Sequence, residues 1–179
     1  MKTGVQIALL RGINVGKANR VSMEELRGLL SGLGYLEVRT LLNSGNAVFE
    51  GADARKDGAG VIEKALQKKL GVACRVIVIS AADLAVIVKE NSLAKVADNP
   101  SRLHVAVPCA PHDLARLRPL QGQQWGDERL AVGTAAAYLW CPRGVIESRL
   151  VKAVDRALGS SVTMRNWATV LKLIRMTAG

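Results

Sequence analysis

The chain has 179 residues, 49% of them hydrophobic, which is enough to bury a sizeable core in one domain or in two small halves that share an interface. No apolar run approaches the roughly 18 to 20 residues that cross a bilayer, and the apolar stretch ending at Leu10 is too short for a secretory signal, so we expect a cytoplasmic protein with no membrane partner. Its 25 basic and 15 acidic residues leave a net charge of +10, which attracts phosphorylated molecules and polyanions whatever the fold.

The cysteines and the aromatic residues narrow the function further. Cys74, Cys109 and Cys141 are an odd set without CxxC spacing, so the sequence predicts neither a disulfide framework nor a zinc site, and it contains no cofactor motif. A reducing cytoplasm fits this set best. Aromatic residues make up 3% of the chain, which is few for a protein that stacks the bases of single strands.

The hydrophobic pattern predicts a first α+β half over residues 1–90. Ser22 is followed three residues later by Glu25, a capping box that begins a helix, and Gly34 ends this helix. The predicted elements in chain order are a strand over Val5–Leu10, the capped helix, a hairpin with strands over Glu37–Leu42 and Val48–Phe49, a helix that stops at Gly71, and a strand over Arg75–Ile79. This order is βαββαβ, the arrangement of a ferredoxin-like unit.

A further helix up to Glu90 and a linker over residues 91–102 lead to a second half over residues 103–179. Its predicted elements are a strand over Leu103–Val107, a short helix over Pro111–Leu117, a hairpin of Arg129–Val132 and Ala137–Cys141, a helix over Val145–Leu158, a strand over Val162–Met164 and a last helix from Trp167 to Met176. We therefore predict an α+β fold of two similar ferredoxin-like subdomains packed together, with extra helices at the linker and at the C-terminus.

The first polar cluster is Arg11–Lys17, a glycine-rich loop that leaves the first strand. A phosphate-binding P-loop needs four residues between its first glycine and the Gly-Lys-Ser/Thr ending, whereas here three residues separate the glycines and alanine follows the lysine. A P-loop is therefore excluded. Either the backbone amides face a ligand while Arg11 and Lys17 supply charge, or Asn14 and the glycines only shape a long turn.

The second cluster is the predicted turn Asn43–Asn46, and Gly45 in it would supply a positive φ. By composition it is an ordinary hairpin turn. Its position makes it interesting, because the loop after the first strand can approach the sheet end where this turn lies. Ser44 and Asn46 are therefore candidate ligand-binding residues.

The third cluster precedes the last helix. Asn166 is a natural N-cap, and Arg165 lies immediately before the helix start, where backbone amides and the helix dipole favour an anion. Trp167 is expected to anchor the core, with Thr169 and Lys172 on the opposite side of the helix. This cluster predicts a clamp for phosphate or carboxylate.

Other chemistries are weakly supported by the sequence. His104 lies inside an apolar strand and His112 follows a proline, so both are expected to cap or pack, and Cys141 is expected to be buried and inert. Neither an activated nucleophile nor a catalytic carboxylate pair is found, and no metal site is predicted. The sequence predicts binding and names no reaction.

The clusters carry a family resemblance. The stretches Leu9–Gly16, Ser22–Leu26, Val38–Thr40 with Asn43–Asn46, and Arg165–Val170 resemble the bacterial family catalogued as domain of unknown function 1697 (DUF1697). The likeness runs from the first strand to the last helix. It implies two α+β subdomains with some similarity to ferredoxin-like units, and it implies no established activity.

The sequence leaves three functions open. The leading prediction is the binding of a phosphorylated or carboxylated small molecule, a nucleotide among them, in one basic pocket. The alternatives are a nucleic-acid binding module without sequence preference, which the shortage of aromatic residues disfavours, and a structural or protein-interaction role. The residues predicted to line the pocket are Arg11, Asn14, Lys17, Ser44, Asn46, Arg165 and Asn166.

Overall fold

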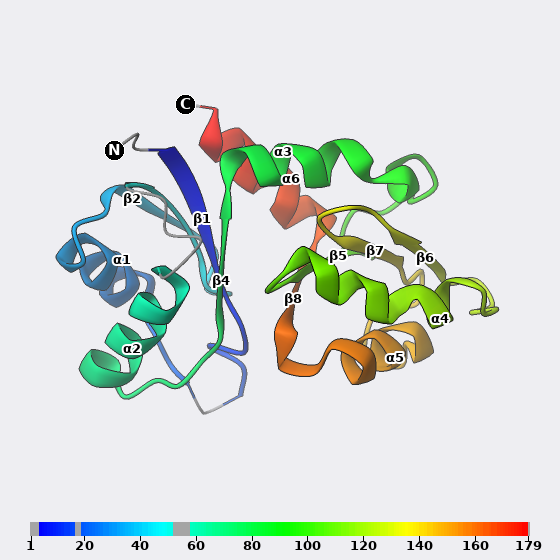
Figure 1. Cartoon of the computed structure of the whole chain (residues 1–179), viewed down its shortest axis with the longest axis horizontal. Helices are drawn as coiled ribbons and strands as arrows, with labels where there is room; N and C mark the ends of the chain where they lie inside the picture. The colour runs from blue at the N-terminus through cyan, green and yellow to red at the C-terminus, as the bar shows by residue number, and fades with distance from the viewer. Residues whose placement is uncertain (1–3, 17–18, 52–57, 179) are drawn as a thin grey trace. The chain divides into compact units, whose positions relative to one another are not determined.

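The computed structural model describes residues 4–16, 19–51 and 58–178. Contacts divide the chain into a first unit, which runs up to Ala82 and includes the chain from Arg175, and a second unit from Asp83 to Ile174 (Figure 1). Each unit contains helices and one four-stranded antiparallel sheet, which confirms the α+β class. The predicted boundaries at residues 90 and 103 stay a prediction. No helix in the described part of the chain is long and apolar enough to cross a membrane.

The first unit has the strand and helix order predicted for it. Its sheet has the strand order β2-β3-β1-β4, and every neighbouring pair is antiparallel. Helices α1 and α2 cover one face of this sheet (Figure 1). The elements are β1 (Gly4–Leu10), α1 (Met23–Gly32), β2 (Leu36–Leu41), β3 (Asn46–Gly51), α2 (Gly58–Leu70) and β4 (Val76–Ser80).

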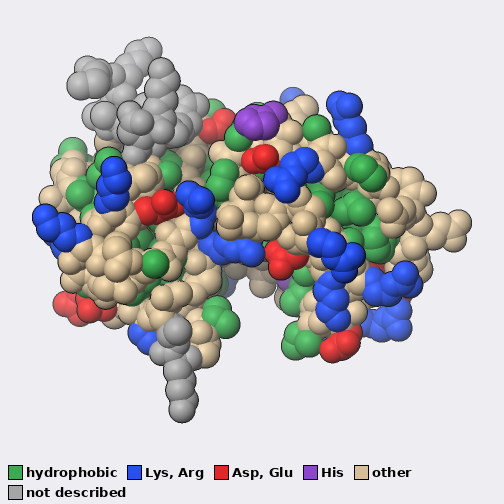
Figure 2. All heavy atoms as spheres, turned by 60° about the horizontal axis from the view of Figure 1, so that its bottom comes forward, with side chains coloured by type: hydrophobic (Ala, Val, Ile, Leu, Met, Phe, Trp, Pro, Cys, Tyr) green, Lys and Arg blue, Asp and Glu red, His purple; other side chains and the backbone are tan. Residues whose placement is uncertain are grey.

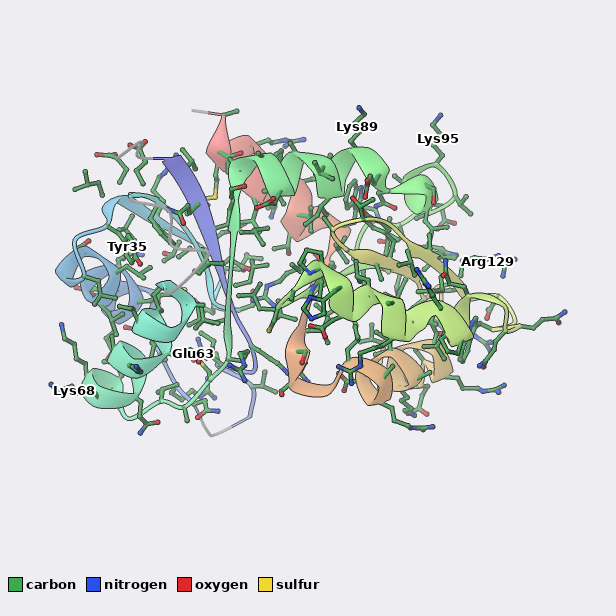
Figure 3. The ribbon with its side chains drawn as sticks, viewed as in Figure 1. Tyr35, Glu63, Lys68, Lys89, Lys95 and Arg129 are labelled. Carbon is green, nitrogen blue, oxygen red and sulfur yellow. The ribbon has the colours of Figure 1, made fainter. Side chains whose placement is uncertain are left out.

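The core of this unit explains its helix and strand patterns. Leu26 on α1, Ile62 on α2 and Phe49 on β3 are fully buried in one apolar cluster. Tyr35 packs its ring against Phe49 with the centroids 4.4 Å apart, and Figure 3 shows it beside the sheet. The predicted capping box is confirmed, since Ser22 Oγ accepts from the amide of Glu25 and Glu25 Oε2 accepts from the amide of Ser22. The capping box therefore determines where α1 begins, and burial of its apolar side chains holds the helix against the sheet.

The second unit has the sheet order β6-β7-β5-β8. Helix α5 packs Leu150 and Val154 into an apolar cluster with Leu139 on one face of this sheet. On the other face, Tyr138 donates from its hydroxyl to the carbonyl of Ile87 at 2.7 Å. The elements are α3 (Ala81–Glu90), the 3-10 helix η1 (Ser92–Lys95), β5 (Leu103–Pro108), η2 (Pro111–Leu117), α4 (Arg118–Gln121), β6 (Arg129–Val132), β7 (Ala137–Trp140), α5 (Arg149–Leu158), η3 (Gly159–Ser161), β8 (Val162–Asn166) and α6 (Trp167–Thr177).

Several element boundaries differ from the prediction by one or two residues, and the strand predicted over Val48–Phe49 extends over Asn46–Gly51. Two further boundaries and one helix face differ for reasons that the structure shows. The helix expected from Val145 begins at Arg149, because Ser148 caps it by accepting from the amide of Val151. Strand β8 continues to Asn166 because it pairs along β5. Thr169, expected on the exposed side of the last helix, is buried at 6% exposure.

Candidate functional site

The loop after β1 is closed by the side chain of Asn14. Its Nδ2 donates to the carbonyls of Val21 at 2.8 Å and Asn43 at 2.7 Å, and its Oδ1 accepts from the amide of Val21 at 2.9 Å. Asn14 has φ +57°, in the left-handed region that asparagine tolerates better than most residues. The bond to Asn43 ties this loop to the turn between β2 and β3. The structure thus brings the first two predicted clusters together.

The turn between β2 and β3 packs closely on the end of β1. The amide of Leu10 donates to the carbonyl of Gly45 at 2.8 Å. A Cβ on Gly45 would lie 2.8 Å from Leu10 Cβ and 2.8 Å from Ile13 Cδ1. Asn46 is fully buried, and its Nδ2 donates to the carbonyl of Leu41 and to Ser44 Oγ, both at 2.9 Å. Asn46 therefore fastens the turn from inside, whereas Ser44 is exposed.

A hollow of about 860 Å³ lies between this loop and this turn. Asn14 and Ser44 are the two predicted site residues in its lining, while Arg11, whose amide donates to the carbonyl of Arg75 at 2.8 Å, lies outside it. Lys17 lies outside the residues that the structure describes. The lining consists of Ile13, Asn14, Val15, Arg20, Val21, Ser22, Met23, Glu25, Asn43 and Ser44.

The charged members of this lining were not predicted as site residues. Arg20 and Glu25 are both exposed, and hydrogen bonds from Ser22 to the carboxylate lower the pKa of Glu25. Arg20 lies at the end of the same loop, two residues before the helix cap Ser22. This position in the sequence could have identified it as a candidate site residue. Glu25 was recognised as a capping residue, and the structure adds that it also borders the hollow.

The third predicted cluster lies in the second unit. Asn166 Oδ1 accepts from the amide and the hydroxyl of Thr169 at 2.9 and 2.8 Å, which confirms it as the N-cap of α6. Trp167 is buried, as expected of a core anchor. Arg165 is 9% exposed and donates from Nη1 to Thr163 Oγ1 and to the carbonyl of Met164, and burial lowers its pKa to about 10. Bonds within the second unit therefore already use some of the hydrogen-bonding groups of Arg165 and Asn166 that the predicted clamp would need.

The cysteine and histidine side chains differ in burial: Cys141 is buried, Cys74 and His104 are partly buried, and Cys109 and His112 are exposed. Cys141 is fully buried, as predicted, and burial raises its pKa to about 11, which disfavours the reactive thiolate. Burial, with a smaller effect of Glu63, also raises the pKa of Cys74 to about 11. Burial and the charge of Arg102 lower the pKa of His104. The described residues include no group of three or more His, Cys, Asp or Glu placed to hold a metal ion.

Comparisons with known proteins find a family and a fold. The sequence profile of a family described as "Protein of unknown function (DUF1697)" matches residues 3–138. Among solved structures, the conserved bacterial protein SP0830 from Streptococcus pneumoniae is 23% identical with a TM-score of 0.76, and the alignment covers 98% of this chain and 99% of that one. Protein BT0572 from Bacteroides thetaiotaomicron is 11% identical over 95% and 96% of the two chains, with a TM-score of 0.23. No curated protein matches the chain.

Proposed function

The chain belongs to the DUF1697 family of proteins of unknown function, and from this premise we propose that it binds a phosphorylated or carboxylated small molecule in the hollow of its first unit. The observation that carries the proposal is the lining, in which the exposed residue Arg20 borders the same hollow as the exposed residues Asn43 and Ser44. A volume of about 860 Å³ is of the size that small ligands occupy.

Charge and hydrogen bonding decide the ligand class. A guanidinium binds carboxylate or phosphate oxygens through charge-assisted hydrogen bonds, which are about twice as strong as neutral ones. Amide and hydroxyl groups can complete the coordination of such an anion without adding a competing charge. The proposal therefore gives Arg20 the role that the sequence suggested for Arg11, and a contribution from Arg165 and Asn166 stays a prediction.

The proposal also includes a ferredoxin-like fold for each unit and a location in the cytoplasm. The strand orders β2-β3-β1-β4 and β6-β7-β5-β8 support the view that each unit is a ferredoxin-like βαββαβ fold. Cys74, Cys109 and Cys141, all among the described residues, form no disulfide bond, which supports a role in the reducing cytoplasm.

A thermal-shift screen tests the binding proposal. Inorganic phosphate, short carboxylates and nucleoside monophosphates are each added to the wild type, and at a concentration of 100 Kd a bound ligand stabilises the fold by about 2.7 kcal/mol. Arg20→Gln is expected to weaken binding at least tenfold, because the charged partner is lost. Arg27→Gln is the matched control, since Arg27 is exposed on α1 and donates to Thr40 outside the hollow. The proposal is wrong if no anion stabilises the protein or if both variants respond alike.

A further inference from the structure

The hollow of the first unit has an apolar side that anion binding does not explain. Among the described lining residues, Ile13, Val15, Val21 and Met23 are apolar. Ile13 and Val21 are buried, but Val15 is 73% exposed and is one of the most exposed large hydrophobic residues described. A ligand that carries only an anionic group would leave this valine in water.

The exposure of Val15 is built into the loop. Its neighbours Asn14 and Gly16 have φ of +57° and +64°, so the chain turns sharply on both sides of it. The three side-chain hydrogen bonds of Asn14 hold this turn to Val21 and Asn43. The backbone thus fixes Val15 at the border of the hollow, where an apolar group of a ligand can cover it.

The charges of the lining distinguish a carboxylate from a phosphate. Glu25 Oε2 accepts from the amide of Ser22 at 2.9 Å, and this bond favours the ionised carboxylate. The amide of Glu25, which an anion at the start of α1 could otherwise use, already donates to Ser22 Oγ at 3.1 Å. The second charge of a phosphate is attracted by Arg20 and repelled by Glu25, so it gains little over the single charge of a carboxylate and costs more dehydration.

We propose that the ligand of this hollow is an amphipathic monocarboxylate, whose carboxylate pairs with Arg20 and whose apolar chain covers Val15 and Met23. This inference rests on the proposed function and narrows its ligand class. The aliphatic residues supply affinity in proportion to the apolar area that the ligand buries, and Arg20 fixes which end of the ligand enters.

The test is a titration with acetate, butyrate, hexanoate and octanoate, followed by methyl NMR at Val15 and Met23. Affinity is expected to rise about fourfold for each methylene that contacts the hollow. Octyl phosphate is expected to bind more weakly than octanoate to the wild type. Glu25→Gln, which can still complete the capping box, is expected to narrow this difference by raising the affinity for octyl phosphate.

The variants separate the apolar contact from the charge. Val15→Ser is expected to reduce the gain in affinity for each methylene of the carboxylate chain. Val96→Ser is the matched control, because Val96 is 59% exposed in the second unit. If carboxylates bind with no dependence on chain length, or if octyl phosphate binds more tightly than octanoate, the inference is overturned and the proposed function stands. If neither anion class binds, the proposed function itself fails.

Discussion

Gly45 is the residue on which the turn beside the hollow depends. It has φ +76°, and a Cβ there would lie 2.8 Å from both Leu10 Cβ and Ile13 Cδ1. Leu10 Cβ belongs to a buried strand and cannot swing away as the end of a long side chain can. We expect Gly45→Ala to lower the free energy of unfolding by about 2 to 4 kcal/mol, as the sum of a left-handed alanine and an overpacked contact.

Gly71→Ala is the control for this substitution. Gly71 also has a positive φ, of +66°, but a Cβ on it would meet nothing within 4 Å. It should therefore cost about 1 to 2 kcal/mol, from the backbone alone. Urea unfolding of the two variants measures the difference, and equal losses would show that the contact with Leu10 and Ile13 does not constrain the turn.

Asn14 and Asn46 show which feature of the site the sequence does not predict, namely whether a side-chain amide binds a ligand or the protein backbone. Their composition and spacing pointed to a polar turn, and the structure confirms that the two clusters meet. The same pattern fits an asparagine that binds a ligand and one that binds backbone carbonyls, because both uses need the same donor and acceptor. Burial decides between them, and the complete burial of Asn46 depends on strands that are distant in sequence.

At the scale of elements, the end of α3 holds the turn between β6 and β7. Glu90 accepts from the amide of Thr134 through Oε2 and from its hydroxyl through Oε1, both at 2.7 Å. A Cβ on Gly133 would lie 2.5 Å from Glu90 Oε2, so glycine makes room for the carboxylate. The hydrogen bonds from Thr134 lower the pKa of Glu90. These contacts therefore hold the C-terminal end of α3 and the β6–β7 hairpin together.

This contact predicts a pH dependence of stability. Because the folded-state pKa of Glu90 is lowered from its ordinary value of 4.5, its contribution is complete above that pH and is lost as the pH falls through the folded-state pKa. Glu90→Gln should cost about 0.5 to 1 kcal/mol at pH 7, since the carboxylate is screened by solvent. Thermal unfolding between pH 7 and pH 3 should show that the difference in stability between the wild type and Glu90→Gln becomes smaller as the pH falls. Asp98→Asn, at an exposed carboxylate of the same unit, should show a smaller gap.

Element boundaries were predictable where the signal is local. The capping box of α1 lies within four residues, so sequence alone located the helix start correctly. The start of α5 was misplaced because Val145 and Ile146 fit a helical apolar pattern, although Ile146 is 81% exposed in a loop where Gly144 has φ +94°. An apolar pattern records which residues could be buried, and only the tertiary fold determines which are.

At the scale of the whole molecule, the net charge of +10 is the difference between 25 basic and 15 acidic residues. On the face drawn in Figure 2, Lys and Arg side chains are interspersed with Asp and Glu. Figure 3 shows Lys89 and Lys95 of the second unit directed away from the ribbon. Arg143 pairs with Asp127 at 2.9 Å, and Arg75 lies 3.5 Å from Glu63. Cations that are separated in this way attract polyanions through the long-range electrostatic field of the protein, and they do not select a particular ligand geometry.

This distribution predicts weak and salt-sensitive binding of nucleic acid. A fluorescent 30-nucleotide single strand should bind at about 50 mM salt and be released by about 200 mM, because the attraction arises from released counterions. With 3% aromatic residues, stacking can add little affinity that survives salt. Fluorescence anisotropy measures the salt slope, and heparin, which offers charge without bases, should compete as well as an unlabelled strand. Retention of the strand at 200 mM salt, or preference for one sequence over heparin, would instead support the nucleic-acid module.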